Sequence, residues 1–456
     1  MIRRTAIVCL ATASLGLSLG PVLAVTPGLS VYVFPTEGLK AASNAALPNS
    51  VAEDFGINIG GMGSDLYRVP GTVNDYWAVT DRGPNNDTTL ADGSAATGFP
   101  VADFSPLIVR FKLNGTTPQI ISRMAIQSSK GVGTTGLPNV PIYDGPPSTV
   151  AGGPGKYNVN GLDTEGIVRT KSGDFWLVDE YAPSVIQVGA DGVIKRRLVP
   201  KGWTGVGTSY PTVDSLPAIF LKRKVNRGFE ALALTPNEKY LYVGLQSPLL
   251  NPTRAVGDAS YQTRILKLDA ETGAVIGEWV YKFDPVNSID STTTRATELK
   301  LSAMVALDDD TLLVQERTDN AFIVAQVKLG AGQSILGSAY DSAATTPSLE
   351  ALAVTDATLN SWVPSKTVIF RSTAVPEMPK KIEGMAVENA TTLAFMNDND
   401  FSFSYDAKAN KVTAGSNPSQ FLYVTLPKPL SVTPDSTMKA LQAAAKAAVT
   451  SKPKVK

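Results

Sequence analysis

The sequence predicts an all-β fold of the β-propeller type, on three observations. A unit of three or four short runs, apolar or alternating, recurs along the chain, as expected for a propeller built from four-stranded blades. The 38 glycines and 31 prolines separate these runs as turn residues do. Most copies open with a glutamate and end their second run at an acid or an amide. We expect six blades, within a range of five to seven, with long loop insertions and a short C-terminal helix.

The first two units each supply four expected strands. The runs of the first unit are Ile57–Val69, Asp75–Asp81, Leu107–Leu113 and Gln119–Ile126. The second unit opens with a β-hairpin, Asn160–Glu180, and continues with Ser184–Val188 and Val193–Val199. Segment 128–159 between the units is polar and rich in Gly, Pro and Thr. We therefore interpret it as a long surface insertion, and segment 201–224 as another excursion.

Three further units follow, and a sixth is expected between the last two. The opening runs of the three units are Phe229–Ala233, Glu298–Leu307 and Ile382–Ala386. Their second runs are Tyr240–Gln246, Thr311–Glu316 and Thr392–Met396. The sixth unit would combine Leu349–Val354 with Thr367–Arg371. We expect the N-terminal strand near Val31 to close the ring against the last blade.

Residues 1–24 have the pattern of an export signal. Two arginines precede an apolar run through Leu19, and Val22-Leu23-Ala24 offers a small-residue cleavage site. The propeller domain is then 25–432, followed by an Ala/Lys-rich helical or disordered tail, 433–456. No later apolar run is long enough to span a bilayer. We expect a monomer that is exported to the periplasm or outside the cell, without stable membrane insertion.

The composition excludes several kinds of chemistry. The chain has no histidine, so Ser-His-Asp and Cys-His machinery and histidine-bound zinc are excluded. Its single cysteine, Cys9, lies in the expected leader, so we expect neither a disulfide nor a thiol nucleophile in the mature chain. Seven of the 41 basic residues lie in the leader or beyond residue 438, which leaves the propeller with an acidic excess. This excess argues against nucleic acid as a partner and favours cations.

Acids recur at two positions of the unit, the opening of the first run and the end of the second. Equivalent blade ends of a propeller converge on one face, so these carboxylates should line one funnel. Without imidazole or thiolate, such a funnel favours Ca²⁺, with Mg²⁺ as the alternative. A single glutamate has a simpler interpretation, as a partner of a backbone N–H or an arginine. The expected metal ligands are Asp81, Glu165, Asp179, Glu180, Glu230, Glu383 and Asp398; Gln246, Glu298, Glu316 and Glu350 hold the same positions in other copies.

Basic residues stand close to these acids in the sequence. One interpretation is charge balance within the acidic ring. The other is recognition of a phosphate or another oxyanion beside the metal, because guanidinium forks match such groups bidentately. The expected substrate-binding residues are Arg82, Arg227, Arg317 and Lys381.

Several motifs in a fixed order resemble those of the family described as "esterase-like activity of phytase". They are Asp81-Arg82-Gly83, Glu165-Gly166, Trp176–Tyr181, Asn226–Glu230, Leu245–Pro248, Arg264–Asp269, Lys380–Gly384 and Asn397–Phe401. The resemblance runs from about residue 56 to 425. It implies a secreted bacterial phytase-like propeller with a hydrolytic site for phosphate or carboxylate esters. The chain departs from the pattern at Ala231, where glycine is usual, and in the long insertion 128–159.

Two classes of function follow. The first is an exported, metal-dependent hydrolase of phytase-like type that acts on phosphate monoesters, with a small anionic ester as its partner. Its metal would screen the phosphate charge and lower the pKa of a bound water, and its catalytic candidates are Glu180, Glu230 and Glu316. Calcium-dependent lactone or carboxylate-ester hydrolysis is the neighbouring alternative. The second class is a non-catalytic propeller that binds a cation or an anionic ligand.

Overall fold

The computed structural model describes residues 22–26, 28–141, 144–149, 153–205, 207–406 and 411–450, and every statement below refers to these residues. Residues 1–21 of the expected leader, with Cys9, lie outside them. Residues 22–24 begin β1 (Val22–Thr26), which pairs antiparallel with β2 (Leu29–Val33). Cleavage after Ala24 would therefore leave two residues of β1.

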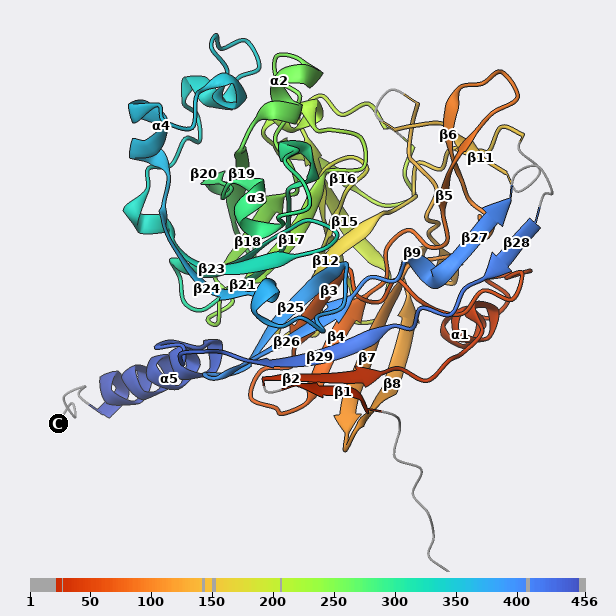
Figure 1. The fold of residues 1–456 in the computed structure, drawn as a ribbon, viewed down its shortest axis with the longest axis horizontal. Coiled ribbons are helices and arrows are strands. Elements are labelled where there is room, and N and C mark those ends of the chain that lie inside the picture. Colours follow the sequence, from red (N-terminus) through yellow and green to blue (C-terminus); the bar gives the residue numbers. More distant parts are fainter. Residues whose placement is uncertain are drawn as a thin grey trace, which may run out of the picture.

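Five sheets form a ring and confirm the propeller (Figure 1). The innermost strand of each sheet contacts the innermost strands of the next and the preceding sheet, and the contact between β25 and β3 closes the circle. In chain order these inner strands are β3 (Asp65–Arg68), β12 (Thr164–Arg169), β17 (Phe229–Leu234), β21 (Lys300–Ala306) and β25 (Ile382–Asn389).

The first three blades follow the predicted meander, and blade four combines its predicted runs with a strand that was expected in a sixth unit. Blade one adds β4 (Asp75–Val79), β7 (Leu107–Asn114) and β8 (Thr117–Ala125). Blade two adds β13 (Phe175–Asp179), β14 (Ser184–Val188), β15 (Ile194–Pro200) and a parallel edge strand, β16 (Thr212–Leu216). Blade three adds β18 (Tyr240–Leu245), β19 (Gln262–Asp269) and β20 (Val275–Lys282). Blade four adds β22 (Thr311–Arg317), β23 (Phe322–Lys328) and β24 (Ser365–Arg371).

The fifth blade contains strands from both ends of the chain. It comprises β25, β26 (Thr392–Asn397), β29 (Gln420–Thr425) and β2, with β1 at its edge. Val31 of β2 pairs with Leu422 of β29, which confirms that the N-terminal strand closes the ring. Four apolar side chains of this pair of strands are buried because they pack into the core between blades four and five: Leu29, Val31, Leu422 and Val424.

The described residues form five blades and not the favoured six. Leu349–Ala351 form a short 3₁₀ helix, η5, where the sixth unit was expected to begin. The other half of that unit is β24, which pairs with β23 as the outer strand of blade four. Residues 329–364 separate β23 from β24, so β24 resembles the start of another repeat in the sequence. Five blades lie within the predicted range.

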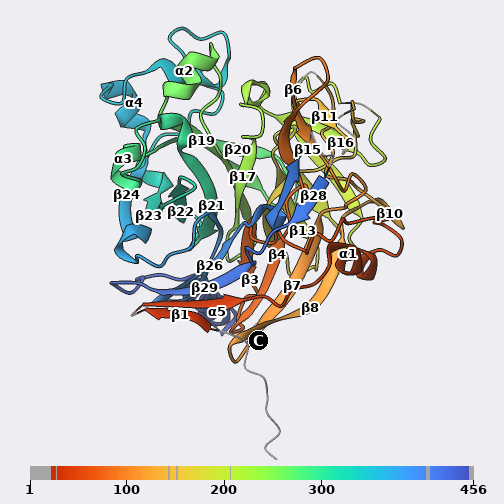
Figure 2. The same cartoon turned by 45° about the vertical axis from the view of Figure 1, so that its right-hand side comes forward.

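Helices and hairpins occupy the connections. The helices are α1 (Leu39–Ala46), α2 (Arg254–Ala259), α3 (Val286–Ile289), α4 (Ala357–Trp362) and α5 (Pro434–Thr450). The 3₁₀ helices are η1 (Ala218–Lys222), η2 (Ala296–Glu298), η3 (Leu329–Ala331), η4 (Ala339–Asp341), η5, η6 (Ser372–Ala374) and η7 (Asp400–Ser402). The remaining strands are β5 (Asn86–Thr89), β6 (Ala95–Gly98), β9 (Gln127–Ser129), β10 (Val132–Gly133), β11 (Pro147–Ser148), β27 (Phe403–Asp406) and β28 (Lys411–Ala414). In Figures 1 and 2 the β6 hairpin and α5 lie on opposite sides of the ring.

The core lies between neighbouring blades. All six residues of β17 are buried, because each inner strand is covered on both faces by adjacent sheets. Leu232 of β17 packs in one apolar cluster with Val178 of β13 from the preceding blade. Burial of this kind is worth about 1.5–3 kcal/mol for each large aliphatic side chain. The ring is therefore held by apolar contacts between blades, which leaves its two mouths as the places where a central site could form.

Candidate functional site

One residue from each blade lies at the same mouth of the ring, at or just after the end of the second strand. These residues are Asp81, Glu180, Gln246, Arg317 and Asp398, and all five line one pocket. Successive side chains of a strand point to opposite faces, so the site position in each blade is fixed by the strand register. We call this cavity the acid pocket.

A β-bulge places a second set of side chains at the same mouth. The pairing register shifts around the second residue of β12, β17 and β25 and around the third residue of β21. A bulge leaves one residue out of the ladder and redirects its side chain. The bulged residues are Glu165, Glu230, Ser302 and Glu383. The three glutamates line the acid pocket, and the Ser302 hydroxyl donates to Glu230 Oε1 at 2.8 Å.

The acid pocket is polar throughout. Its cavity volume is about 130 Å³. Eight carboxylates, five cationic side chains and three amides line it. The carboxylates are Asp81, Asp163, Glu165, Glu180, Glu230, Glu383, Asp398 and Asp400; the cations are Arg82, Arg227, Lys300, Arg317 and Lys381; the amides are Asn85, Asn226 and Gln246. Such a lining suits a hydrated ion or an anionic group and offers little to an apolar ligand.

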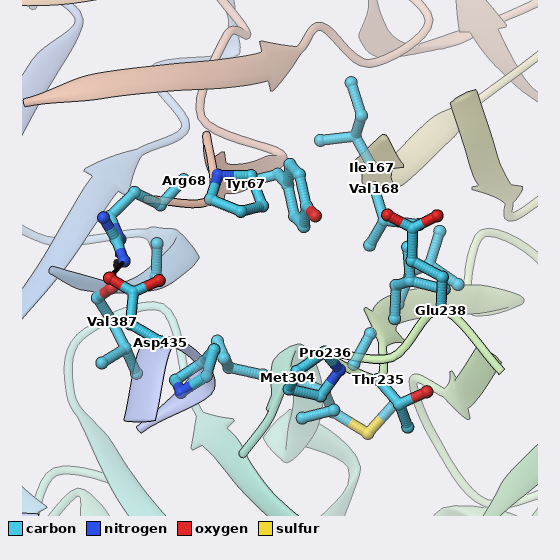
Figure 3. A pocket seen from close by; sticks show the side chains of 18 of the residues that line it. Tyr67, Arg68, Ile167, Val168, Thr235, Pro236, Glu238, Met304, Val387 and Asp435 are labelled. Carbon is cyan, nitrogen blue, oxygen red and sulfur yellow. Dashed lines mark hydrogen bonds and ion pairs between the residues drawn. The ribbon is translucent and has the colours of Figure 1, made fainter. Parts of the chain in front are cut away.

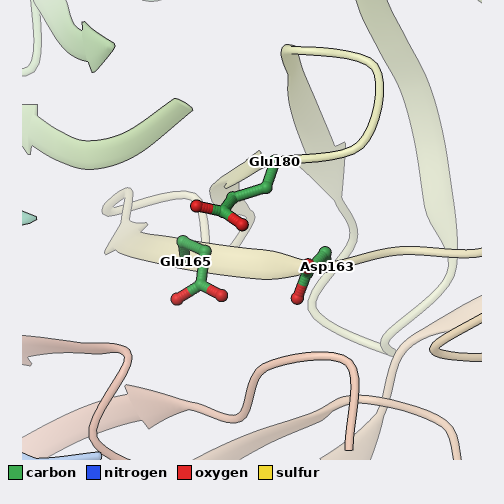
Figure 4. Close-up of side chains that lie close together, drawn as sticks. All are labelled: Asp163, Glu165 and Glu180. Atoms are coloured by element: carbon green, nitrogen blue, oxygen red, sulfur yellow. The ribbon is translucent and has the colours of Figure 1, made fainter. Parts of the chain in front are cut away.

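Three of these carboxylates converge. Asp163, Glu165 and Glu180 each offer an oxygen atom, and these atoms all lie within 4.8 Å of one another (Figure 4). Asp163 immediately precedes β12, Glu165 is the bulged residue of that strand, and Glu180 follows β13, so one hairpin supplies all three. All three side chains are buried. We call this group the carboxylate triad.

Burial makes three negative charges in this place unfavourable. It raises the pKa of Asp163 to about 6, although the Arg82 guanidinium opposes the shift. Burial also raises the pKa of Glu165 well above its usual value, and the neighbouring Asp163 carboxylate adds to the effect. The pKa of Glu180 is raised by burial and then by Glu230. The triad therefore needs either protons or a bound cation to stay together.

Gln246 adds a neutral oxygen beside the triad. Its Nε2 donates to Glu180 Oε1 at 2.6 Å and also to Glu230 Oε2. Its Oε1 is buried and has no hydrogen-bond partner among the described residues. A buried acceptor without a donor costs free energy unless a water or an ion satisfies it. Carboxylate and amide oxygens together form the kind of donor set that Ca²⁺ and Mg²⁺ take.

The structure places Asp179 and Glu316 outside the acid pocket, in contrast to the sequence prediction. Asp179 is paired with Arg197, and its Oδ2 also accepts from the Ser184 hydroxyl at 2.9 Å. Glu316 accepts from Lys366 Nζ at 2.7 Å and from the backbone N–H of Asp284 at 2.8 Å. Both acids are the last or second-last residue of a second strand, one position before the residue that faces the pocket. That single step along a strand reverses the side-chain direction.

Two other glutamates that were expected at the recurrent acid positions, Glu298 and Glu350, also lie elsewhere. Glu298 ends the short helix η2 and pairs with exposed Arg295 at 3.3 Å. The bulge position of blade four belongs to Ser302. Glu350 is buried against Arg264, at 3.0 Å, on the outer side of blade three. Neither glutamate lines the acid pocket.

The remaining predicted site residues do line the acid pocket. They are Asp81, Arg82, Glu165, Glu180, Arg227, Glu230, Arg317, Lys381, Glu383 and Asp398. Sequence reasoning missed Asp163, Lys300 and Asp400 as site residues. The only sequence signal for Asp163 is its place two residues before Glu165. This signal does not repeat, because Gly228 and Lys381 stand at the same place before Glu230 and Glu383.

The opposite mouth of the ring is an apolar chamber (Figure 3). It is lined by the C-terminal halves of the inner strands, including Ile167, Leu232 and Met304, with a cavity volume of about 90 Å³. The first turn of α5 covers it: Asp435 pairs with Arg68 of β3, and Met438 reaches the lining. The two mouths therefore differ in character, and the ionisable groups of the centre are concentrated at one of them.

Comparison with known proteins yields one family and several remote relatives. The family model described as "Phytase-like: Esterase-like activity of phytase" matches residues 57–401. An "Uncharacterized secreted protein" of Arthroderma benhamiae is 26% identical over 265 residues, which cover 49% of this chain and 51% of that protein. The chain thus spans about half the length of this curated relative.

Solved structures match at low identity. Regucalcin from Agrobacterium tumefaciens str. C58, described as a calcium-binding protein, has a TM-score of 0.32 and 12% identity, covering 88% of this chain and 98% of that one. Virginiamycin B lyase from Staphylococcus aureus has a TM-score of 0.29 and 12% identity, covering 80% and 96%. A Lactobacillus plantarum protein has a TM-score of 0.32 and 12% identity, covering 81% and 87%.

The family match extends over the blades that form the acid pocket, from β3 to η7. Within the described part of the chain, no helix has both the length and the apolar character needed to cross a membrane. The sequence motifs, the propeller and the matched range agree. The chain belongs to the phytase-like family described as "esterase-like activity of phytase".

Proposed function

We propose that this protein is an exported ester hydrolase that acts on small phosphate monoesters with the help of a divalent cation, Ca²⁺ in the first place. The observation that carries the proposal is the carboxylate triad, whose oxygen atoms lie within 4.8 Å of one another in a pocket without apolar lining. The family description, which names an esterase-like activity, supports the reaction class.

The residues present fit a hard cation. Asp163, Glu165 and Glu180 would hold it, and the partnerless Oε1 of Gln246 would add a neutral oxygen. When bound, such a cation supplies positive charge for the phosphate oxygens and lowers the pKa of a water molecule. Magnesium is the alternative because it shares the preference for oxygen ligands.

The chain's own residues supply the rest of the chemistry. Arg227 faces the same pocket and would orient the anionic ester. Glu180 and Glu230 remain the candidates for proton transfer, because both face the acid pocket. Glu230 accepts hydrogen bonds from Ser302, Gln246 and Arg317, which fixes its position. Glu316 is not retained as a catalytic candidate, since it is bonded to Lys366 away from the pocket.

The location outside the cytoplasm rests on two supports. The first 24 residues have the pattern of an export signal. The relative from Arthroderma benhamiae is named a secreted protein. We propose that the protein works as an exported monomer in the periplasm or outside the cell.

A hydrolysis panel tests the proposal. The purified protein is incubated with p-nitrophenyl phosphate, p-nitrophenyl acetate and a lactone, before and after treatment with EDTA, with Ca²⁺ or Mg²⁺ added back. We expect phosphate-ester hydrolysis that falls at least tenfold with the chelator and returns with Ca²⁺. Full activity in the presence of chelator would contradict the metal dependence. Absence of hydrolysis on all three substrates would support a binding protein instead.

Carboxylate-ester or lactone hydrolysis is the second candidate. The specific observation in its favour is the family description, which names esterase-like activity and no phosphate chemistry beyond the word phytase. The same panel separates the two, because p-nitrophenyl acetate or the lactone would then be hydrolysed faster than p-nitrophenyl phosphate.

A further inference from the structure

Arg227 differs from the other cations of the acid pocket in its partners. Each of the other four is paired with a carboxylate: Arg82 with Asp163 (3.1 Å), Lys300 with Asp319 (2.5 Å), Arg317 with Glu230 (3.2 Å) and Lys381 with Asp398 (3.7 Å). The Arg227 side chain forms no ion pair with any described residue, and its one hydrogen bond among these residues goes from Nη1 to the Ser247 hydroxyl at 3.2 Å. Most of its five N–H donors are therefore left for a ligand.

The surroundings of Arg227 disfavour an uncompensated charge. The side chain is half-buried and lines the acid pocket. Burial lowers the pKa of Arg227, even though the Glu180 and Glu230 carboxylates act in the opposite direction. A guanidinium stays protonated at any physiological pH, so the unfavourable charge is relieved by an anion rather than by loss of a proton.

The backbone holds Arg227 beside the triad. Asn226 has a φ of +54°, a left-handed conformation, and its Oδ1 accepts from the Arg82 guanidinium. On the other side, a Cβ on Gly228 would come within 2.6 Å of the Cα of Glu180, so only glycine fits. The Gly228 carbonyl also accepts from the Gln246 backbone N–H at 2.9 Å. Strained backbone that is fixed by its neighbours is common where a side chain must be aimed.

We propose that Arg227 is the residue by which the acid pocket binds its ligand's oxyanion, and that this ligand carries a single oxyanion group. The guanidinium fork matches two oxygen atoms of a phosphate or a carboxylate bidentately. The inference rests on the proposed function for placing the ligand in this pocket, and it narrows the substrate to esters with one anionic group.

The net charge of the acid pocket supports a ligand with a single oxyanion group. Eight carboxylates face five cations, four of which are already paired. One bound divalent cation leaves the formal charge of this set negative. A ligand with several phosphates would place its further charges against carboxylates, and like charges in contact are repulsive.

Binding of inorganic phosphate tests the role of Arg227 without requiring catalysis. Isothermal titration of the full chain with phosphate, in the presence of Mg²⁺, is compared for the wild type, Arg227→Gln and Arg227→Lys. We expect the glutamine variant to bind about ten- to hundredfold more weakly, and the lysine variant to fall between, because it keeps the charge and loses the fork. Arg295→Gln is the matched control, since Arg295 is exposed and outside the pocket.

The outcomes separate this inference from the proposed function. Unchanged phosphate binding in Arg227→Gln, with an unaltered melting temperature, would overturn the role of Arg227. Absence of phosphate binding by the wild type would also overturn it. Phosphate binding through Arg227 without hydrolysis of any ester would support the inference and reject the proposed function. Inositol hexakisphosphate serves as the polyanionic probe: binding tenfold tighter than that of inositol monophosphate would overturn the restriction to one oxyanion.

Discussion

Nη2 of Arg317 lies 3.2 Å from Oε1 of Glu230, across the contact between blades three and four. The same nitrogen also pairs with Glu383 of blade five. All three side chains are buried. One guanidinium thus connects three blades at the acid pocket, and it balances two carboxylates that are not part of the triad.

Replacing Arg317 by methionine should destabilise the fold strongly. The change leaves Glu230 and Glu383 buried without their cation, and breaking a buried pair on one side costs about 3–5 kcal/mol. Urea denaturation followed by tryptophan fluorescence measures the loss. Arg295→Met, which removes an exposed arginine, should stay within about 0.5 kcal/mol of the wild type. A loss for Arg317→Met no larger than this control would show that the bridge carries no net stability.

Glu278 should give the protein a pH-dependent stability outside the acid pocket. Burial raises the pKa of Glu278 to about 7, against the pull of Arg264. Its Oε1 accepts from Arg264 at 2.6 Å, and its Oε2 has no partner among the described residues. The folded state therefore binds this proton more tightly than the unfolded chain. Its contribution to stability is fully present below pH about 4.5 and is lost as the pH rises to about 7.

The variant Glu278→Gln tests this contribution because the amide resembles the protonated acid. We expect it to match the wild type near pH 4.5 and to be the more stable protein at pH 8. The measurement is the difference in free energy of unfolding between the two proteins across that range. A constant difference would mean that Glu278 does not titrate there.

Glu180 and Glu316 stand near the ends of the second strands of their blades, but only Glu180 faces the acid pocket. Replacement by glutamine should therefore affect the two sites differently. Glu180→Gln should lower divalent-cation affinity by at least tenfold, because Glu180 belongs to the triad. Glu316→Gln should leave cation affinity and hydrolysis unchanged and reduce stability, because it weakens the pair with Lys366. Calcium titration calorimetry and thermal melting distinguish these effects. Equal cation affinities in the two variants would reject the triad as the binding site.

Gly228→Ala should disturb the acid pocket through the backbone. The added Cβ meets the backbone of Glu180, which cannot rotate away as a side chain would. Overpacking of this kind costs about 1–3 kcal/mol, and it should shift Arg227 and weaken phosphate binding. Gly145→Ala is the control, since a Cβ there has no atom within 4 Å. Wild-type phosphate binding by Gly228→Ala would show that this close contact does not position Arg227.

Much of the fold was accessible from the sequence because inner strands are covered on both faces. The buried run Phe229–Leu234 is apolar at all positions but one, and shorter apolar runs stand at the same place in other copies. Glu165, Glu230 and Glu383 were found for the same reason, since each interrupts such a run at its second residue. The number of blades was not accessible, because the connection before β24 contains the apolar run Leu349–Val354, which resembles the opening strand of another unit.

The side-chain directions at the strand ends could not be obtained from the pattern. Asp179 and Glu180 are adjacent acids in the sequence, yet Asp179 pairs with Arg197 and Glu180 belongs to the carboxylate triad. Which of the two enters the pocket depends on the pairing of Thr164 with Asp179 and on the bulge at Glu165. Register and bulges arise from contacts between strands, and a list of runs does not contain them.

The pairing of Val31 with Leu422 joins a strand near the start of the chain to one near its end. Among the blade strands, β29 is the last in chain order, so this pair of strands cannot form before nearly all of the chain is present. Until then the fifth sheet lacks its outer strands and the circle stays open. The mouth that gathers Glu165, Glu230 and Glu383 therefore reaches its final shape only in the finished molecule, and a shortened product that ends before β29 has no complete centre.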